Sequence, residues 1–309
     1  ASYAIIRTEN GNSEYIIEEY NWVAGAEYAD SIGADVINSS LGYYRFDDST
    51  QNHSYLDMNG GKTIVTKGAD MAASKGILVV NSAGNEGNDP WNYIIAPADG
   101  DSVMAVGAVD RNGQRAAFSS LGPSADGRVK PNISAMGKNN LVQLTDSSFA
   151  RGSGTSFSSP VIAGLSACLW QAFPDLNNQE VMDAIEKNSH LYDNPNPLMG
   201  YGIPDFFKAY RMLKTSQNTK PDPEETFIKI FPNPFSQSFY FEIFCEQACK
   251  NEIKIFNPDG RLVYSTNIQT KQGYNLKKLQ IPNHISQGIY IFQLKNKQLQ
   301  WSKKIIKHE

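Results

Sequence analysis

The residues best suited to chemistry lie in one glycine-rich turn, Gly152 to Gly164, which carries Ser156 near its middle. The turn leads into an apolar helical run from Val161 to Trp170. Glycine permits close backbone approach and positive φ at low cost, and the N-terminus of a helix places partial positive charge beneath a serine hydroxyl. Pro160 fits the first turn of such a helix, where its nitrogen needs no intrahelical partner. The pattern suits a nucleophilic hydroxyl, but on these residues alone a plain serine N-cap is the preferred interpretation, because such caps are common.

Helices and buried strands alternate through the first two-thirds of the chain. Apolar spacing predicts helices over 15–32, 63–74 and 179–187, and unbroken apolar runs predict strands over 35–38, 76–80 and 103–109. Residues 43–61 show no period and predict a loop. This alternation is typical of an α/β fold built on a parallel sheet.

Small polar residues follow two of these strands. Residues 39–42 read Ser-Ser-Leu-Gly and residues 82–85 read Ser-Ala-Gly-Asn. Parallel strands end at one rim of the sheet, where ligands of such sheets bind. Asn85 could point its amide N–H at a bound group there, although asparagine is also common in tight turns. Two such strand ends and a glycine-rich serine turn together favour a binding site.

Several stretches resemble, in order, the subtilisin-like serine proteases. Residues 154–164 resemble the family's catalytic-serine motif, 35–42 its substrate-binding strand and 79–87 its oxyanion-hole segment. Residues 118–120, 129–133 and 201–205 resemble further stretches of the family, so the likeness covers about residues 1–213. It implies a subtilisin-like parallel sheet flanked by helices and incomplete at the N-terminus.

The resemblance implies a role for each matching residue. Ser156 would be the nucleophile, and Asn85 would donate to the oxyanion together with the backbone N–H of Ser156. Substrate binding would fall to strand-end and turn residues: Ser40, Leu41, Gly42, Ala83, Gly84, Gly154 and Thr155. Small residues at 83 and 84 leave room for a sizeable apolar side chain. No cofactor is implied for the chemistry.

The family's catalytic Asp and His motifs are missing from this sequence. A serine nucleophile needs a base, and that base needs an orienting acid. His53, His190, His284 and His308 lack the flanking glycine and threonine of the family's histidine motif, and we expect them to be surface or loop residues. Residues 3–7 resemble a strand that the family places after that motif. We therefore expect a fragment of a longer protease, inactive alone; a descendant that lost its catalytic front is the competing hypothesis.

The charge changes sign along the chain. Residues 226–309 carry 12 Lys and Arg against 5 Asp and Glu, whereas the whole chain has a net charge of −4. This asymmetry supports two units. Residues 214–225 are polar, contain two prolines and predict an extended linker. The lysines beyond it are spread between strand-like segments, which favours a solvated face over a nucleic-acid site.

Residues 226–309 predict a small antiparallel β-sandwich of about seven short strands. The unit resembles the C-terminal sorting domain of the bacterial type IX secretion system, on four stretches: 231–235, 256–263, 288–292 and 303–307. The resemblance implies export to the cell surface or medium, with the secretion machinery and polypeptide substrates as partners. An appended adhesion module is the alternative. A non-catalytic binder on a degenerate protease scaffold is the alternative for the whole chain.

The cysteines, the loop carboxylates and the apolar runs give only weak indications of disulfides, metal binding or membrane insertion. Cys168 lies in an apolar helix and predicts a core residue. Cys245 and Cys249 are close enough in sequence to form a disulfide, but if both lay on one strand their side chains would point the same way and lie too far apart. Asp47, Asp48, Asp57, Asp89 and Asp99 lie in loops and could contribute to a structural calcium site, but solvated carboxylates are the preferred interpretation. No apolar run is long enough to cross a bilayer.

Overall fold

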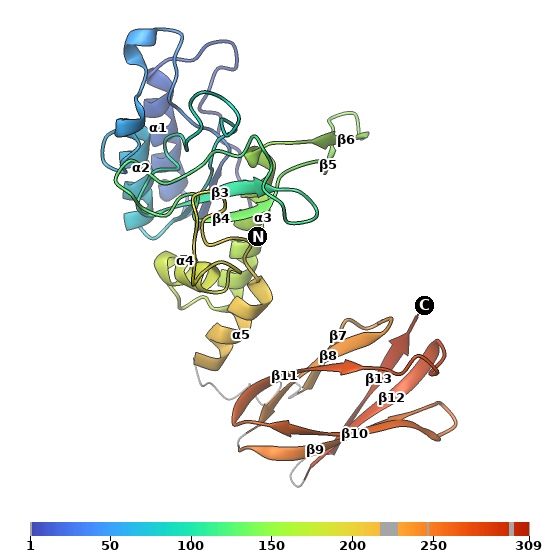
Figure 1. Ribbon diagram of the computed structural model, residues 1–309. Helices are drawn as coiled ribbons and strands as arrows, with labels where there is room; N and C mark the ends of the chain where they lie inside the picture. Colours follow the sequence, from blue (N-terminus) through green and yellow to red (C-terminus); the bar gives the residue numbers. More distant parts are fainter. Residues whose placement is uncertain (1, 217–227, 246, 297–299, 309) are drawn as a thin grey trace. The chain divides into compact units, whose positions relative to one another are not determined.

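The chain forms two compact units, Ala1–Tyr210 and Arg211–Glu309. The computed structural model describes residues 2–216, 228–245, 247–296 and 300–308 (Figure 1). The unit boundary lies inside helix α5 (Phe206–Ser216), so the first three residues of the predicted linker are helical. The linker residues 217–225 lie outside the described residues. The division at residues 213 and 226 stays a prediction.

A parallel sheet of order β1-β2-β3-β4 organises the first unit. Its strands are β1 (Val36–Ser39), β2 (Leu78–Ser82), β3 (Val103–Val109) and β4 (Ile133–Met136). Every residue of β2 and β3 is buried, as expected of strands covered on both faces. The predicted parallel sheet is confirmed.

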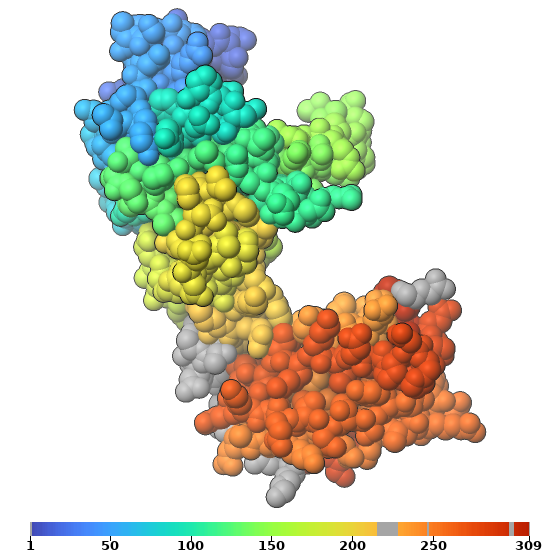
Figure 2. All heavy atoms as spheres, viewed as in Figure 1, coloured from blue at the N-terminus to red at the C-terminus, as the bar shows by residue number. Residues whose placement is uncertain are grey.

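Helices flank this sheet. Helix α3 (Thr155–Ala172) packs against all four strands, whereas α2 (Ile64–Ser74) packs against β2 and β3. Helix α1 (Ile17–Ser31) packs against α2, and its Trp22 donates to the Ser39 hydroxyl of β1 at 3.0 Å. Helix α4 (Asn178–Lys187) contacts β2 and α3. Two short 3₁₀ helices, Ser49–Gln51 and Tyr55–Asp57, occupy the predicted loop. A hairpin of β5 (Asn140–Gln143) and β6 (Phe149–Gly152) projects from the unit, in light green in Figure 2.

The predicted strand over residues 3–7 is wrong. Residues 2–10 form no strand, and the side chains of Tyr3 and Ile5 are 90% and 89% exposed. A strand needs a neighbouring strand that shares its backbone hydrogen bonds. In the part of the chain that the structure describes, β1 is the outermost strand on its side of the sheet, and residues 3–7 do not pair with it. Apolar residues alone therefore do not make a strand here.

The buried face of α1 differs from the one that apolar spacing predicts. Ile17 and Tyr20 are exposed, whereas Glu18 and Glu19 are buried. One carboxylate oxygen of Glu19 accepts hydrogen bonds from the backbone N–H groups of Ile64 (2.9 Å) and Val65 (3.1 Å), at the N-terminus of α2. A carboxylate there satisfies orphan donors and complements the helix dipole. Glu19 lies in the first turn of α1, but its carboxylate stabilises the N-terminus of α2.

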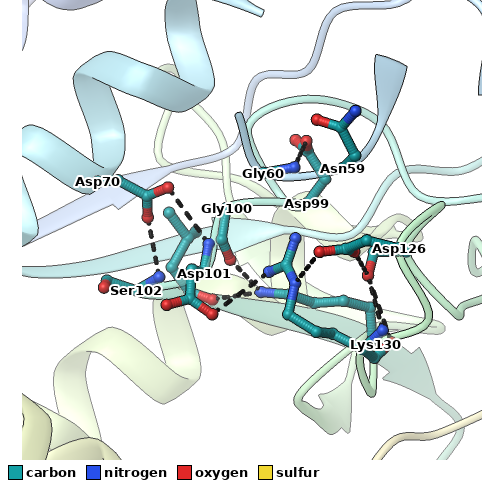
Figure 3. A network of polar contacts seen from close by, with 12 residues as sticks. Asn59, Gly60, Asp70, Asp99, Gly100, Asp101, Ser102, Asp126 and Lys130 are labelled. Atoms are coloured by element: carbon teal, nitrogen blue, oxygen red, sulfur yellow. Dashed lines mark hydrogen bonds and ion pairs between the residues drawn. The ribbon is translucent and has the colours of Figure 1, made fainter. Parts of the chain in front are cut away.

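A buried lysine fastens the segment that leads into β3 (Figure 3). The Lys130 ammonium donates to the carbonyl oxygens of Gly100 (2.6 Å) and Val103 (2.7 Å) and to the Asn132 side chain (3.0 Å). Nearby, Asp99 is fully buried and accepts from Gly60 N–H at 2.8 Å, so it is not the solvated loop carboxylate that the sequence predicts. These bonds hold the loop before β3 against the segments around Gly60 and Lys130.

We expect Lys130→Met to lower the free energy of unfolding by about 3 kcal/mol, because it removes the ammonium donor from three buried acceptors, of which Asn132 Oδ1 keeps a second donor, the Ala105 N–H. Chemical denaturation at neutral pH measures this loss. The exposed Lys138 provides the matched control, since Lys138→Met removes the same charge without uncovering buried acceptors. Equal stabilities of the two variants would contradict the role given to Lys130.

The difference in stability between the wild type and Lys130→Met should depend on pH. Burial lowers the pKa of Lys130 from 10.5 to about 8. The unfolded chain therefore binds more protons than the folded chain between these values, so the lysine's contribution to stability rises with pH across this window. Below the lower value the lysine is charged in both states, and the contribution is flat. The stability gap between the wild type and Lys130→Met should widen from pH 8 towards pH 10.5.

The second unit is an antiparallel sandwich. One sheet has the order β10-β9-β12-β13 and the other β11-β8-β7. The strands are β7 (Ile228–Phe231), β8 (Ser238–Cys245), β9 (Cys249–Phe256), β10 (Leu262–Thr270), β11 (Gly273–Gln280), β12 (Gly288–Lys295) and β13 (Gln300–Lys307). Phe239, Phe241 and Phe292 lie fully buried in its core. The predicted seven-stranded sandwich is confirmed.

The cysteines are placed differently from the sequence-based expectation. Cys168 is exposed on α3 and is not a core residue. It shares one face of the helix with Val161 and Leu165, which are 41% and 43% exposed. Cys245 ends β8 and Cys249 begins β9, so the two do not share a strand.

Candidate active site

Ser156 is the second residue of α3, and Gly154 is the N-cap. The prediction that Ser156 caps the helix is therefore wrong. Its side chain is half-buried in the first helical turn, where the backbone N–H groups have no intrahelical acceptors. The Gly154 N–H donates to Gly137 O at 2.9 Å, which ties the turn to the end of β4. The sheet and the helix together fix where the serine stands.

Pro160 lies deeper in α3 than the sequence predicts, as its sixth residue and beyond the first turn. A proline there cannot donate to the carbonyl four residues earlier, which is that of Ser156. The Ser40 hydroxyl takes this place and donates to Ser156 O at 3.1 Å. In return, the Ser156 hydroxyl makes a long 3.5 Å hydrogen bond to Ser40 O. The end of β1 and the start of α3 are therefore joined at Ser156.

Asn85 is fixed by the residue next to Ser156. Its side-chain oxygen accepts from the Thr155 backbone N–H at 2.8 Å and from the Thr155 hydroxyl at 3.1 Å. The same hydroxyl accepts from Gly84 N–H at 3.3 Å. Because the two branches of an amide diverge, holding the oxygen sets the direction of the NH₂ group. Asn85 is exposed, so its N–H donors are accessible from solvent.

The remaining predicted binding residues form the rim around this turn. Leu41 O accepts from the Asn81 side chain at 3.1 Å, which joins the segments after β1 and β2. Ala83 is fully buried, and its backbone donates to Val106 O (3.0 Å) and accepts from Ile95 N–H (3.3 Å). A methyl group at Gly42 would collide with Ile95. Close packing therefore explains the small residues along the rim.

Gly84 needs glycine for two reasons. Its φ of 110° is unfavourable for other residues, and a methyl group would collide with the carboxylate of Glu86 and the hydroxyl of Ser120. The Ser120 hydroxyl donates to Glu86 Oε2 at 2.9 Å and accepts from the Glu86 N–H at 3.1 Å. Burial raises the pKa of Glu86, although the hydrogen bond from Ser120 opposes this rise. An acid therefore lies beside the predicted specificity pocket.

Two asparagines of the site, Asn38 and Asn81, were missed from the sequence. Asn38 Oδ1, at the exposed end of β1, accepts from the Ser159 hydroxyl of α3 at 2.8 Å. Asn81 is fully buried inside β2, where it makes the bond to Leu41 described above. The only signal for them was the occurrence of asparagine inside strands, where it is depleted.

The histidines of the first unit are engaged away from Ser156. His53 Nε2 contacts the carboxylate of the buried Glu19, and the His53 side chain is only 15% exposed. His53 thus lies in a loop, as expected, but its side chain is largely buried. His190 Nδ1 accepts from Ile203 N–H at 2.8 Å. Within the described residues, Ser156 Oγ hydrogen-bonds to Ser40 O and not to a histidine.

The loop carboxylates have local roles in the described ranges. Asp48 caps the 3₁₀ helix Ser49–Gln51, Asp57 closes a capping box with Ser54, and Asp47 accepts from Glu14 N–H. Among the residues that the structure describes, no group of three His, Cys, Asp or Glu side chains is arranged to hold a metal ion. A structural calcium site was the less favoured interpretation of these carboxylates, and it stays untested. In the same ranges, no helix combines the length and apolar character needed to span a membrane.

The parallel sheet carries Ser156 in the first turn of α3 and holds Asn85, from the segment after β2, against that turn, which is the arrangement expected of a subtilisin-like protein. The Subtilase family matches residues 1–202, and the chain belongs to this family. Among curated relatives, the thermostable alkaline protease of Halalkalibacterium halodurans is 35% identical over 179 residues, covering 58% of this chain and 43% of the relative. Subtilisin DY of Bacillus licheniformis is 34% identical over 168 residues, covering 54% of each chain. The chain thus spans about half the length of these relatives.

Solved structures agree on the fold. The prenylagaramide maturation protease PagA superposes with a TM-score of 0.52 at 24% identity, covering 63% of this chain and 67% of that one. The self-cleaved protease domain of PatA gives a TM-score of 0.52 at 24% identity, covering 63% and 68%. At this identity the likeness concerns the fold alone.

The second unit matches a different family. Residues 229–308 match the Secretion system C-terminal sorting domain. A type IX sorting domain of this kind marks a bacterial protein for export, so the protein is secreted or held at the cell surface.

Proposed function

We propose that the protein hydrolyses peptide bonds as a serine endopeptidase through an acyl-enzyme. Ser156 is the nucleophile, and the Asn85 amide and the Ser156 backbone N–H donate to the oxyanion. The observation that carries this proposal is the fixed orientation of Asn85 by Thr155, beside the serine at the start of α3. Donors that are held in place before reaction stabilise the developing charge without the cost of reorganisation.

We assign substrate binding to the rim around this turn. Ser40, Leu41 and Gly42 follow the edge strand β1, where an extended peptide can add by backbone hydrogen bonds. Ala83 and Gly84 border the pocket for a substrate side chain, and Gly154 and Thr155 complete the rim. Protease names among the curated relatives support polypeptides as the substrate class.

We propose further that the catalytic base and its orienting acid are supplied by polypeptide outside these 309 residues. His53 is paired with Glu19, and His190 is bonded to the backbone. The exposed stripe of Val161, Leu165 and Cys168 on α3, the helix that carries Ser156, supports a covering segment.

The experiment compares casein hydrolysis by the purified 309-residue chain and by the full-length protein. We expect the full-length protein to be active and the shorter chain to show only background hydrolysis, because its serine has no base. Circular dichroism checks that the shorter chain is folded. Hydrolysis by the folded 309-residue chain that is lost with Ser156→Ala would show that the base lies within it.

For the second unit, we propose that the type IX secretion machinery recognises residues 226–309. The sorting-domain match supports this partner. Removing these residues from the full-length protein should stop export and leave peptidase activity in the cell extract. An adhesion module in the same place would leave export intact.

A further inference from the structure

Two thiols of the second unit face each other across its two sheets. Cys245 ends β8, in the three-stranded sheet, and Cys249 begins β9, in the four-stranded sheet. Their sulfur atoms lie 4.0 Å apart, and both cysteines are free thiols. Strands that diverge into different sheets can turn two nearby side chains towards each other, which residues on one strand cannot do.

A polar cluster surrounds this thiol pair. The Thr270 hydroxyl lies 3.2 Å from Cys245 Sγ and 3.3 Å from Cys249 Sγ, and it also donates to Cys249 O at 3.1 Å. The Asn251 amide lies 3.5 Å from Cys249 Sγ and 3.0 Å from the Thr270 hydroxyl. These bonds hold both cysteines at one end of the sandwich, where β10 also passes towards β11.

We propose that Cys245 and Cys249 form a disulfide when the protein is exported, and that this bond links the two sheets of the sandwich. Secreted and periplasmic proteins meet oxidising surroundings, in which disulfides form and persist. The sorting domain places this chain in that class of proteins. The sulfurs are already close to van der Waals contact, so side-chain rotation brings them to bonding distance.

The oxidant is the disulfide of a thiol–disulfide exchange protein or of a small disulfide such as oxidised glutathione. The Cys249 thiolate, on the more exposed of the two residues, attacks a sulfur of that donor and releases one donor thiolate. The Cys245 thiolate then attacks Cys249 Sγ, forms the protein disulfide and releases the second donor thiolate. The two protons of the cysteines pass to the donor, so two electrons move from the protein to the donor. An exchange protein leaves as a dithiol, and oxidised glutathione leaves as two molecules of the reduced thiol.

The test counts thiols in the full 309-residue chain after treatment with oxidised glutathione. The protein is denatured, alkylated without reduction and analysed by mass spectrometry. We expect alkylation of the exposed Cys168 alone, and a peptide that spans Cys245 and Cys249 with a mass two hydrogens below its reduced form. After reduction, all three cysteines should be alkylated. Alkylation of both Cys245 and Cys249 before reduction would overturn the proposal.

Thermal unfolding gives a second measurement. Closing a short loop and joining two sheets should raise the melting temperature of the second unit by about 5–10 °C. A reducing agent should remove this difference from the wild type and have no effect on the Cys245→Ser/Cys249→Ser variant. Cys168→Ser is the matched control and should respond to the reducing agent as the wild type does. A wild type whose melting temperature ignores the reducing agent would contradict the stabilising link.

Discussion

Ser156→Ala in the full-length protein should reduce the turnover of a peptide substrate by on the order of 10⁶-fold, the loss known for removing the serine of subtilisin, a relative of this chain. The reason is chemical, because alanine has no atom that can form the acyl-enzyme. The remaining activity would come from substrate binding and the oxyanion donors. Hydrolysis of a chromogenic peptide measures the loss.

The fold should survive this change, because the Ser156 hydroxyl contributes only one long hydrogen bond to Ser40 O. Ser153→Ala is the matched control, because Ser153 is an exposed serine of the same turn. In the part of the chain that the structure describes, its hydroxyl accepts one hydrogen bond, from the Asn139 N–H. We expect near wild-type turnover from the control. A Ser156→Ala protein that keeps more than about a tenth of its activity would contradict the nucleophile assignment.

Asn85→Ala should lower kcat by about 10²–10³-fold and leave KM nearly unchanged, a size known from the corresponding donor of subtilisin. Thr155 holds the Asn85 amide in place. In the proposed role this amide donates to a charge that exists only in the transition state, so we expect ground-state binding to lose little. Steady-state kinetics of the full-length protein separate the two constants.

Asn88→Ala is the matched control for this change, since Asn88 is an exposed asparagine of the same loop. It should leave both constants near their wild-type values. A rise in KM without a fall in kcat for Asn85→Ala would show that Asn85 binds substrate and does not stabilise the oxyanion.

Much of the fold follows from local pattern. The buried strands β2 and β3 are visible as unbroken apolar runs, because both of their faces are covered. The sandwich is visible as short alternating strands between turns. Asn177 is the N-cap of α4, and its side chain accepts from the Glu180 N–H in a capping box. This is a local signal that can be read from the sequence.

Local pattern failed where a distant residue decides the structure. The buried face of α1 cannot be read from its apolar residues, because Glu19 serves the start of α2, 45 residues away. Cys168 sits in an apolar helix and is nonetheless exposed. Periodicity identifies a helix, whereas only tertiary packing decides which of its faces is covered.

The candidate site shows the same limit. Its residues Ser156 and Asn85 were expected from the sequence, but the contacts that orient them were not. Ser40 and Ser156 are 116 residues apart, and their bond depends on the carbonyl that Pro160 leaves without a helical donor. The position of Pro160 in the sixth place of α3, and not in its first turn, creates that opening.

The most direct test of the account is covalent labelling of Ser156. A serine-directed fluorophosphonate is incubated with the full-length protein, and the labelled peptide is identified by mass spectrometry. We expect one adduct, on Ser156, that appears together with the loss of peptidase activity and is absent from Ser156→Ala. An adduct on another serine, or complete inactivation with Ser156 unmodified, would contradict the proposal that this residue is the nucleophile.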